Sequence, residues 1–263
     1  MPLPPLPEQR RIVGILDEAF AGIARAVAAT EKNLANAREL FESNLNEVFD
    51  HSHDGWIEKP LSGFVNEIST GPFGSLLHKS DYVQGGIPLV NPINIVGEQI
   101  VPDARKAVGE RTYQRLSNYT LSLGDIVIGR RGEIGRCAVV GREQAGWLCG
   151  TGCFIIKPSE ESNSHFLAHL LRSRHYRRIL EQDAKRATMP NLSNKELARL
   201  VIQLPAIAEQ RRLLGELDEL RFETQRLESL YRRKLAALAE LREALLQKAF
   251  AGELTREAGG CRP

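Results

Sequence analysis

The chain has 263 residues, enough for a buried core. Its 35 Lys and Arg residues nearly balance its 33 Asp and Glu residues, which gives a net charge of +2. A charge this small does not indicate a polyanion partner for the chain as a whole. Four cysteines lack paired CxxC spacing, and there is neither a signal-peptide pattern nor an apolar run of membrane-spanning length. These features exclude a secreted disulfide scaffold and a membrane protein, and they predict a cytoplasmic protein with reduced thiols.

The first predicted element is a long N-terminal helix. No proline occurs between Glu8 and Phe49, and apolar residues recur three and four positions apart. This spacing predicts a coiled-coil seam, because a helix lying on a sheet would show a broader apolar stripe. We therefore expect residues 1–50 to form an N-terminal helical region. The expected seam comprises Val13, Leu16, Phe20, Ile23, Val27, Leu34, Ala37, Phe41 and Val48.

The next segment, residues 51–203, has the pattern of a mixed α/β domain. Glycines and prolines become frequent, and a helical stretch follows from His165 to Gln182. Ser193 and Glu196 fit a capping box that begins another helix. The fold class is therefore predicted to be α+β. Short β-prone runs cover residues 87–90, 125–129, 137–140 and 153–158.

Positive charge in this segment falls into three clusters. Arginine beside a flexible glycine turn suits phosphate groups and guanine edges, because its planar fork can bond two acceptors at once. A single exposed arginine is usually only a solvated surface residue, so the prediction depends on the three clusters together. They comprise Arg130, Arg131 and Arg136 in the turn GRRGEIGR; Arg172, Arg174, Arg177 and Arg178 in the helical stretch; and Lys185 and Arg186 in KRATMPNLSNKE.

A loop rich in small residues, STGPFGSLLHKSDY, runs from Ser69 to Tyr82. Small side chains let backbone N–H groups approach a phosphate, and hydroxyl and lysine groups add donors. The alternative is a plain surface turn in which Phe73 fills the core. The candidate DNA-binding residues of this loop are Thr70, Gly71, Phe73, Ser75 and Lys79.

A second long helix is predicted over residues 204–254, and its sequence repeats the first. Leu3-Pro4 corresponds to Leu204-Pro205, and the motif EQRR at residues 8–11 recurs at residues 209–212. The register holds without a gap for most of both helices, so chance does not explain it. The two helices could close a simple hairpin or act as a spacer. Their seam is interrupted by polar residues that can fix its register: Thr30, Asn44, Thr224 and Lys234.

The motifs of common enzymes are missing. There is no GxxxxGK[ST] phosphate loop, and the glycines at 129, 132 and 135 do not form the dinucleotide fingerprint. Asn91-Pro92-Ile93-Asn94 lacks the second proline and the aromatic residue of the adenine methyltransferase loop. His51 and His53 have no further ligands at a suitable spacing, so a metal site is not expected. The chain is predicted to bind and position, with no cofactor and no catalytic residue of its own.

Several of these segments together resemble the specificity subunit of type I restriction-modification systems. The resemblance is carried by LPPLPEQRR before the first helix, the GPFGS loop, GIPLVNPINI, the GDIVIGRRGEIGR hairpin, and the passage from NLSNKEL to LPAIAEQRR. It extends over nearly the whole chain to about Leu254. The twice-written Leu-Pro and Glu-Gln-Arg-Arg phrase is its most specific element.

The resemblance implies a non-catalytic subunit that reads DNA. In that family, two target recognition domains each read half of an interrupted sequence, and the conserved helices form an antiparallel coiled coil. Modification subunits methylate adenine with S-adenosylmethionine, and restriction subunits translocate and cleave DNA with ATP. This chain has one recognition domain instead of two, so it resembles a half-subunit. If two copies pair about a two-fold axis, the target should be a palindromic interrupted sequence.

The sequence thus predicts four parts: helical region 1–50, target recognition domain 51–203, helical region 204–254 and a disordered tail 255–263. A coiled-coil scaffold whose central domain binds protein is the main alternative, and an independent methyltransferase or nuclease would need motifs that are absent. The predicted DNA-binding residues are Thr70, Gly71, Phe73, Ser75, Lys79, Arg130, Arg131, Arg136, Arg174, Lys185, Arg186 and Asn191.

Overall fold

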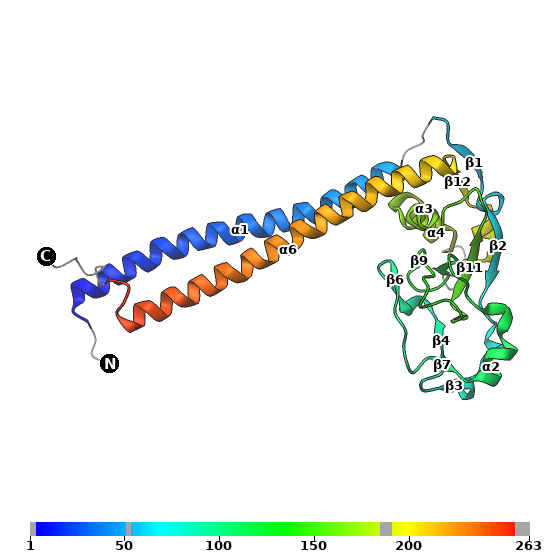
Figure 1. Ribbon diagram of the computed structural model, residues 1–263, viewed down its shortest axis with the longest axis horizontal. Coiled ribbons are helices and arrows are strands. Elements are labelled where there is room, and N and C mark those ends of the chain that lie inside the picture. Colours follow the sequence, from blue (N-terminus) through cyan, green and yellow to red (C-terminus); the bar gives the residue numbers. More distant parts are fainter. Residues whose placement is uncertain (1–3, 51–53, 185–190, 256–263) are drawn as a thin grey trace. The chain divides into compact units, whose positions relative to one another are not determined.

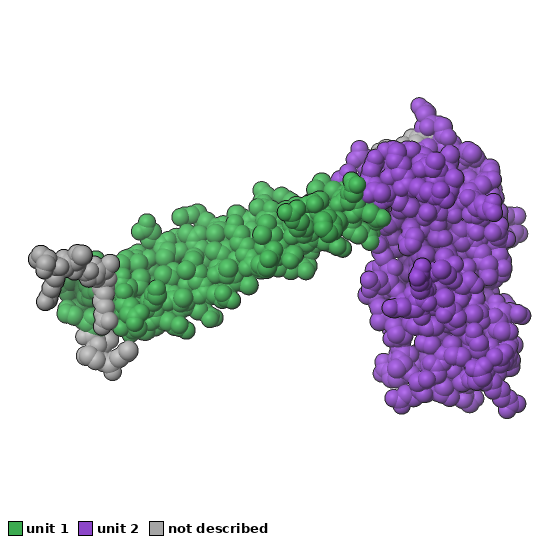
Figure 2. Space-filling view, in the orientation of Figure 1, with its two compact units in different colours: residues 1–43, 218–263 green, residues 44–217 purple. Residues whose placement is uncertain are grey.

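The computed structural model describes residues 4–50, 54–184 and 191–255. The chain divides into two compact units (Figure 2): unit 1 is residues 1–43 with 218–263, and unit 2 is residues 44–217. Within the described ranges, no helix combines the length and apolar character that a membrane span requires. The predicted mixture of helices and strands with a long helix near each end is confirmed.

Unit 1 is formed by most of two long helices that lie side by side, α1 (Leu6–Asp50) and α6 (Ile207–Ala251) (Figure 1). At 1.5 Å per residue each helix is about 68 Å long. Residue numbers rise along one helix as they fall along the other, so the pair is antiparallel, as predicted. Three contacts show this: Arg38 Nε to Glu228 Oε2 at 3.2 Å, the Arg221 guanidinium 4.8 Å from the Phe41 ring centre, and the Arg242 guanidinium 5.4 Å from the Phe20 ring centre.

The seam between the helices differs from the predicted one in two respects. Val13 was expected to lie in it, but 54% of its surface is exposed. Thr30 and Thr224 are buried, and each donates its hydroxyl to the carbonyl four residues earlier in its own helix, at 2.6 and 2.9 Å. These bonds satisfy the hydroxyls locally. Neither threonine therefore requires a polar partner on the facing helix.

The described residues of unit 2 contain two four-stranded sheets. The first has strand order β2-β11-β8-β9 and is fully antiparallel, and the second has order β10-β4-β7-β3 with only β10 and β4 parallel. Two smaller pairs, β1-β12 and β5-β6, complete the strands. The strands are β1 (Ile57–Pro60), β2 (Val65–Thr70), β3 (Tyr82–Val83), β4 (Ile87–Val90), β5 (Ile95–Val96), β6 (Gln99–Ile100), β7 (Ala107–Val108), β8 (Ile126–Gly129), β9 (Cys137–Val139), β10 (Leu148–Cys149), β11 (Cys153–Pro158) and β12 (Val201–Leu204).

Four shorter α-helices lie in the part of the same unit that the structure describes. The expected capping box is present, because the Ser193 hydroxyl accepts from the Glu196 N–H and the Glu196 carboxylate accepts from the Ser193 N–H. The single helical stretch predicted up to Gln182 is instead broken at Ser173, whose extended backbone ends one helix and precedes the next. The helices are α2 (Glu110–Arg115), α3 (Ser164–Arg172), α4 (Arg174–Ala184) and α5 (Asn194–Arg199).

The core of unit 2 surrounds the two central strands of the first sheet. All four residues of β8 and the first four of β11 are buried, as expected for strands covered on both faces. Helix α3 buries its apolar residues against this layer, and the ring of Phe166 meets that of Phe49 edge to face at 5.0 Å. The last turns of α1 and the first turns of α6 are thus part of this unit, which extends beyond residues 51–203.

The second copy of the repeat begins α6 with a buried glutamine. The Gln210 side chain is fully buried, and its Nε2 donates to the carbonyls of Pro205 and Glu161, both at 2.8 Å. Its Oε1 accepts from the Asn163 N–H at 2.8 Å. The first copy makes the equivalent local bond, from Gln9 Nε2 to the Pro4 carbonyl at 2.7 Å. The repeated phrase therefore has one structural function in both copies, which is to close the turn before a long helix.

A buried carboxylate at the start of β8 makes a testable contribution to stability. The Asp125 carboxylate accepts from the Ser122 N–H at 2.8 Å, and burial raises the pKa of Asp125 above its usual value. The native state therefore holds this proton more tightly than the unfolded state, so its contribution to stability falls as pH rises through the native pKa. Asp125→Asn keeps an acceptor and removes the charge. We expect urea unfolding to show a gain on the order of 1 kcal/mol at pH 7 that vanishes near pH 4.

The matched control for this prediction is Asp218→Asn, which removes a carboxylate that is exposed on α6. It should change the free energy of unfolding by less than about 0.5 kcal/mol at either pH. If Asp125→Asn destabilises the protein more at pH 7 than at pH 4, the ionised carboxylate is stabilising and the assignment is wrong.

Candidate nucleic-acid interface

Three strands of the first sheet bring several predicted residues to one end of the sheet. Thr70 at the end of β2 pairs with Phe154 in the central strand β11. On the other side of β11, Cys153 pairs with Gly129, the last residue of β8. Arg130 and Arg131 follow Gly129 directly, so they lie at the end of the sheet where Thr70 also lies.

Gly71 is required by close backbone packing. A Cβ atom on Gly71 would overlap the carbonyl oxygen of Gly150, which explains why only glycine fits. Its N–H donates to the Cys153 carbonyl at 3.0 Å, and the residue is buried. This amide is therefore already satisfied and is not available to a phosphate. Gly71 holds the loop after β2 against the turn that precedes β11.

Asn191 holds the two arginines that follow β8. Its Oδ1 accepts from Arg130 Nε at 3.1 Å and from Arg131 Nε at 3.3 Å. The backbone contributes as well, because the Leu192 N–H donates to the Arg130 carbonyl at 3.0 Å. The Arg130 guanidinium also lies 5.2 Å from the ring centre of the buried Phe154. One neutral amide thus fixes two guanidinium groups, one of which also packs on an aromatic ring.

No carboxylate of the described residues compensates the charge of this pair. Burial, together with the neighbouring charge of Arg131, lowers the pKa of Arg130, yet an arginine remains protonated at neutral pH. Among the described residues, neither guanidinium has a carboxylate partner within ion-pair distance. Two like charges held close together by a neutral group form a site that favours an anion with several acceptor oxygens.

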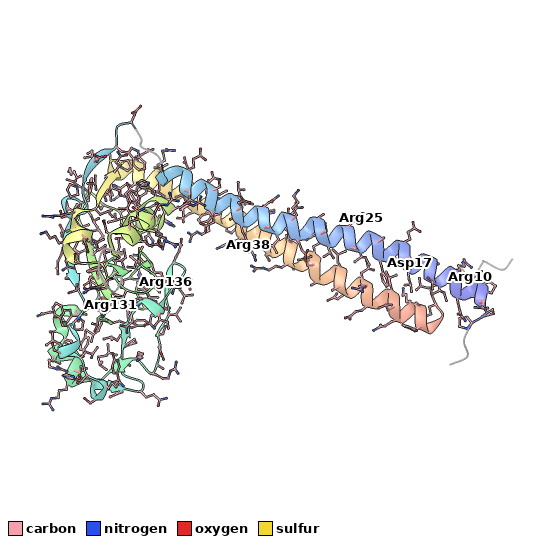
Figure 3. The ribbon with its side chains drawn as sticks, turned by 180° about the vertical axis from the view of Figure 1, so that it is seen from behind. Arg10, Asp17, Arg25, Arg38, Arg131 and Arg136 are labelled. Carbon is pink, nitrogen blue, oxygen red and sulfur yellow. The ribbon has the colours of Figure 1, made fainter. Side chains whose placement is uncertain are left out.

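Arg136, at the end of the same turn, is held differently. Figure 3 labels both Arg131 and Arg136 in unit 2. Arg136 forms an ion pair with Glu133, and its Nη1 donates to the Ile95 carbonyl at 3.4 Å. Its charge is therefore compensated within the turn. The turn also packs on α4, because a Cβ atom on Gly135 would lie 3.0 Å from Cγ of Arg177.

The loop after Gly71 presents the remaining residues of its group to solvent. Phe73 is 63% exposed, so the alternative in which it fills the core is wrong. Ser75 and Lys79 are also exposed, in two short 3-10 turns. Arg115 of α2 fixes this loop by donating to the Leu76 carbonyl at 2.8 Å and to the Asp81 carboxylate at 2.9 Å.

Other predicted residues lie elsewhere or outside the described ranges. Arg174 is exposed at the start of α4, where its N–H donates to Asn46 Oδ1 at 3.3 Å. Its side chain is not among the described partners of Asn191. Lys185 and Arg186 lie outside the described residues, as do His51 and His53. Among the residues that are described, no group of three or more His, Cys, Asp or Glu side chains could hold a metal ion.

The three described cysteines are buried and make no metal-binding group. Burial raises the pKa of the Cys137 thiol to about 11, and it also raises the pKa values of Cys149 and Cys153. These side chains pack as small apolar groups in the core. Reactive thiol chemistry is not expected at these positions, because the thiolate is the reactive form.

Sequence reasoning missed two residues beside the arginine pair. Phe154 supports Arg130, and the turn Asn91-Pro92-Ile93-Asn94 carries a side chain, Ile93, that is 77% exposed. In the sequence, this turn was noted only as an incomplete adenine methyltransferase loop, and Phe154 only as part of a β-prone run. Its packing partners are distant in sequence, so the pattern alone could not locate them.

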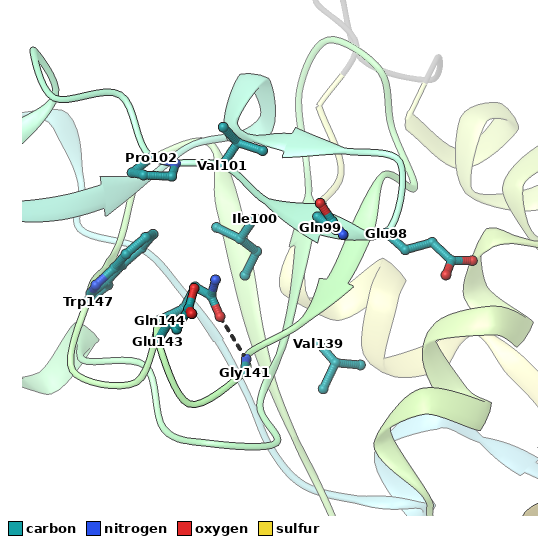
Figure 4. Close-up of a pocket in the computed structure, with 10 residues that line it drawn as sticks. All are labelled: Glu98, Gln99, Ile100, Val101, Pro102, Val139, Gly141, Glu143, Gln144 and Trp147. Carbon is teal, nitrogen blue, oxygen red and sulfur yellow. Dashed lines mark hydrogen bonds between the residues drawn. The ribbon is translucent and has the colours of Figure 1, made fainter.

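An open pocket of about 430 Å³ lies elsewhere in the same unit (Figure 4). It is lined by the Trp147 side chain, by Ile100 of β6, and by two acidic side chains, Glu98 and Glu143. Gln144 closes one side by accepting from the Gly141 N–H at 3.2 Å. The Glu98 carboxylate is paired with Arg172, whose Nη2 lies 3.0 Å from Oε1, so Arg172 compensates its charge.

Comparisons with known proteins identify the family. The chain is 23% identical over 280 residues to the type I restriction enzyme EcoBI specificity subunit of Escherichia coli, across 98% of this chain and 59% of that protein. The crystal structure of the HsdS subunit from Thermoanaerobacter tengcongensis is similar at a TM-score of 0.66 and 25% identity, across 97% of this chain and 61% of that one. A structure that addresses complex assembly and conformational transition of the type I R-M system contains a chain similar at a TM-score of 0.72 and 25% identity, across 97% and 62%.

The chain thus spans less than two thirds of the length of each of these relatives. Residues 66–231 match the family described as the type I restriction modification DNA specificity domain. Because this match covers more than half of the residues and both similar folds agree with it, the chain belongs to the type I restriction-modification DNA specificity family.

Proposed function

We propose that unit 2 is a target recognition domain that binds one half-site of an interrupted DNA sequence. The observation that carries the proposal is the uncompensated pair of Arg130 and Arg131, fixed by the single amide of Asn191. Phosphate oxygens and the O6 and N7 atoms of guanine are acceptors that suit two such guanidinium groups. Family membership supports the same conclusion.

The other predicted residues contribute to this proposal in different ways. Thr70, Phe73, Ser75 and Lys79 supply donors and one exposed ring from the loop after β2, and Gly71 positions that loop. Arg136 orders the turn, since Glu133 compensates its charge. Three further residues are proposed to contact phosphate groups: Arg174, Lys185 and Arg186.

The proposed partners follow from the relatives. We propose that the chain positions modification subunits and restriction subunits on DNA, and that methylation and cleavage belong to those partners. The long antiparallel helices support a spacer role, because a coiled coil holds the groups at its ends a fixed distance apart. The chain itself would then act without a cofactor.

The turns that Gln9 and Gln210 close at the start of the two long helices, here called the joints, support a proposal that two copies of the chain pair. Gln210 binds the backbone of the turn containing Glu161 and Asn163. Gln9 repeats the bond to its proline, but within the described residues its side chain makes no bond to such a turn. We propose that Gln9 lies in the contact between two copies and binds a backbone turn of the second copy other than residues 161–163, which Gln210 already holds. Each pair would then present two identical domains to a palindromic interrupted target.

The recognition proposal is tested with the full chain and a labelled random-sequence duplex. The affinity for DNA should fall steeply as the salt concentration rises. A plot of the logarithm of the binding constant against the logarithm of the salt concentration should have a slope of about −0.9 for each phosphate contacted. A protein-binding scaffold would show no salt-dependent duplex binding, and that result would favour the alternative function. Methylome sequencing of cells that carry this chain with a cognate modification subunit should then give a two-part adenine motif with a fixed gap.

The pairing proposal is tested by sedimentation with and without the modification subunit. The wild-type chain should sediment as a dimer at micromolar concentration, and Gln9→Ala should shift it toward the monomer. A wild-type chain that remains monomeric under both conditions would contradict pairing while leaving DNA recognition by the single domain intact.

A further inference from the structure

The turn Asn91-Pro92-Ile93-Asn94 exposes one apolar side chain in a rigid frame. Ile93 is 77% exposed, more than any other large apolar side chain described in unit 2. Water contact on this scale is unfavourable for an isoleucine, yet scattered surface residues of this kind are common. What distinguishes Ile93 is how firmly its backbone is held and which residues lie beside it.

Two asparagines lock the turn. The Asn91 N–H donates to Asn94 Oδ1 at 2.9 Å, and the Asn94 N–H donates to the Asn91 carbonyl at 2.8 Å. The buried Asn94 side chain also donates to the Val101 carbonyl at 3.0 Å, and the backbone carbonyl of Asn94 accepts from the Val101 N–H at 2.8 Å. The backbone on both sides of Ile93 is therefore fixed, and little ordering would be needed when its side chain meets a ligand.

Pro92 joins this turn to the arginine pair. A Cβ atom on Gly152 would lie 2.8 Å from Cδ of Pro92, and one on Gly129 would lie 3.3 Å from Cβ of Pro92. The proline therefore packs against both glycines. Gly129 directly precedes Arg130, and Gly152 accepts from the Arg130 N–H at 2.9 Å. Ile93 thus projects from a turn that is packed against the base of the Arg130 loop.

An exposed, fixed isoleucine next to arginines that favour guanine edges has a specific chemical complement. The C5-methyl group of thymine is the one apolar feature in the major groove of B-DNA. We propose that Ile93 contacts a thymine C5-methyl group, and that it is a specificity-determining residue for a T·A pair next to the bases contacted by Arg130 and Arg131. This inference rests on the proposed recognition of DNA by unit 2.

The test begins with selection from a randomised duplex library by the full chain. The wild-type chain should select a motif that contains a T·A pair next to a G·C pair. Ile93→Ala should lose the preference for thymine at that position and keep the preference for guanine. Leu123→Ala is the matched control, because Leu123 is 62% exposed in the turn before β8, at the opposite end of the strand from Arg130. It should leave the motif unchanged.

The methyl group itself is tested by replacing the selected thymine with uracil. For the wild-type chain, the loss of one methyl contact should weaken binding by about threefold to tenfold. Ile93→Ala should bind the thymine and uracil duplexes equally. The inference is overturned if the wild-type chain binds the uracil duplex as tightly as the thymine duplex. It is also overturned if Ile93→Ala loses as much affinity on the uracil duplex as the wild type does. A wild-type chain that selects no motif at all contradicts the proposed function instead.

Discussion

Replacing Asn191 with aspartate should weaken duplex binding by about tenfold to a hundredfold without destabilising the fold. The substitution keeps the shape of the side chain and places a carboxylate at 3.1 and 3.3 Å from the two arginine Nε atoms. That carboxylate would compensate the charge that the proposed phosphate or guanine contact requires. The free energy of unfolding should stay the same or rise, because the arginines gain an ion-pair partner. Fluorescence anisotropy with a labelled duplex and urea unfolding measure the two effects.

The matched control is Asn118→Asp, which adds the same charge at an exposed position of unit 2. It should change duplex affinity by less than about threefold at physiological salt, because a distant charge is screened. An equal loss in both variants would mean that only overall charge matters. If Asn191→Asp binds DNA as well as the wild type, the arginine pair is not the contact that carries recognition.

Replacing Gln210 with alanine should destabilise unit 2 by about 2 to 5 kcal/mol. The side chain is fully buried and satisfies the Asn163 N–H together with the carbonyls of Glu161 and Pro205. Its removal would leave these backbone groups without this partner, the Pro205 carbonyl in a buried position, and would open a cavity. Urea unfolding of the full chain, monitored by circular dichroism, should show the loss as a lower midpoint.

The repeat supplies a matched control for this prediction. Gln9→Ala removes the same residue type and the same bond to a proline carbonyl, but at a more exposed position. It should cost less than about 1 kcal/mol at protein concentrations where the chain is monomeric. If both variants lose the same free energy of unfolding, the bond to the proline carbonyl supplies most of the stabilisation by Gln210. The bonds to the turn at residues 161–163 would then add little stability.

Much of the fold could be predicted because it depends on local patterns. The long helices follow from proline-free stretches with apolar residues at a period of 3.5, and the strands β4, β8, β9 and β11 coincide with β-prone runs. The capping box at Ser193 is also a local signal. The break at Ser173 was missed because both flanking segments are helical and no glycine or proline marks the boundary.

The candidate site was predicted less completely because its contacts are long-range. The arginine turn and Asn191 were each singled out from the sequence, but no pattern indicated that one amide would hold both arginines across some sixty positions of chain. The exposure of Ile93 likewise depends on the packing of Pro92 against Gly129 and Gly152. Residue type alone suggested which side chains could bind DNA. That these side chains lie close together depends on the pairing of strands β2, β11 and β8, which the sequence pattern did not reveal.

The joint at Gln210 has a consequence for how such chains can change. All three of its hydrogen bonds end on main-chain atoms, namely those of Pro205, Glu161 and Asn163. Main-chain groups are present whatever side chains surround them, so the joint places little demand on the interior sequence of the domain. A different domain that offers the same backbone turn could be exchanged at this point by recombination. New DNA targets could then arise without redesign of the helices.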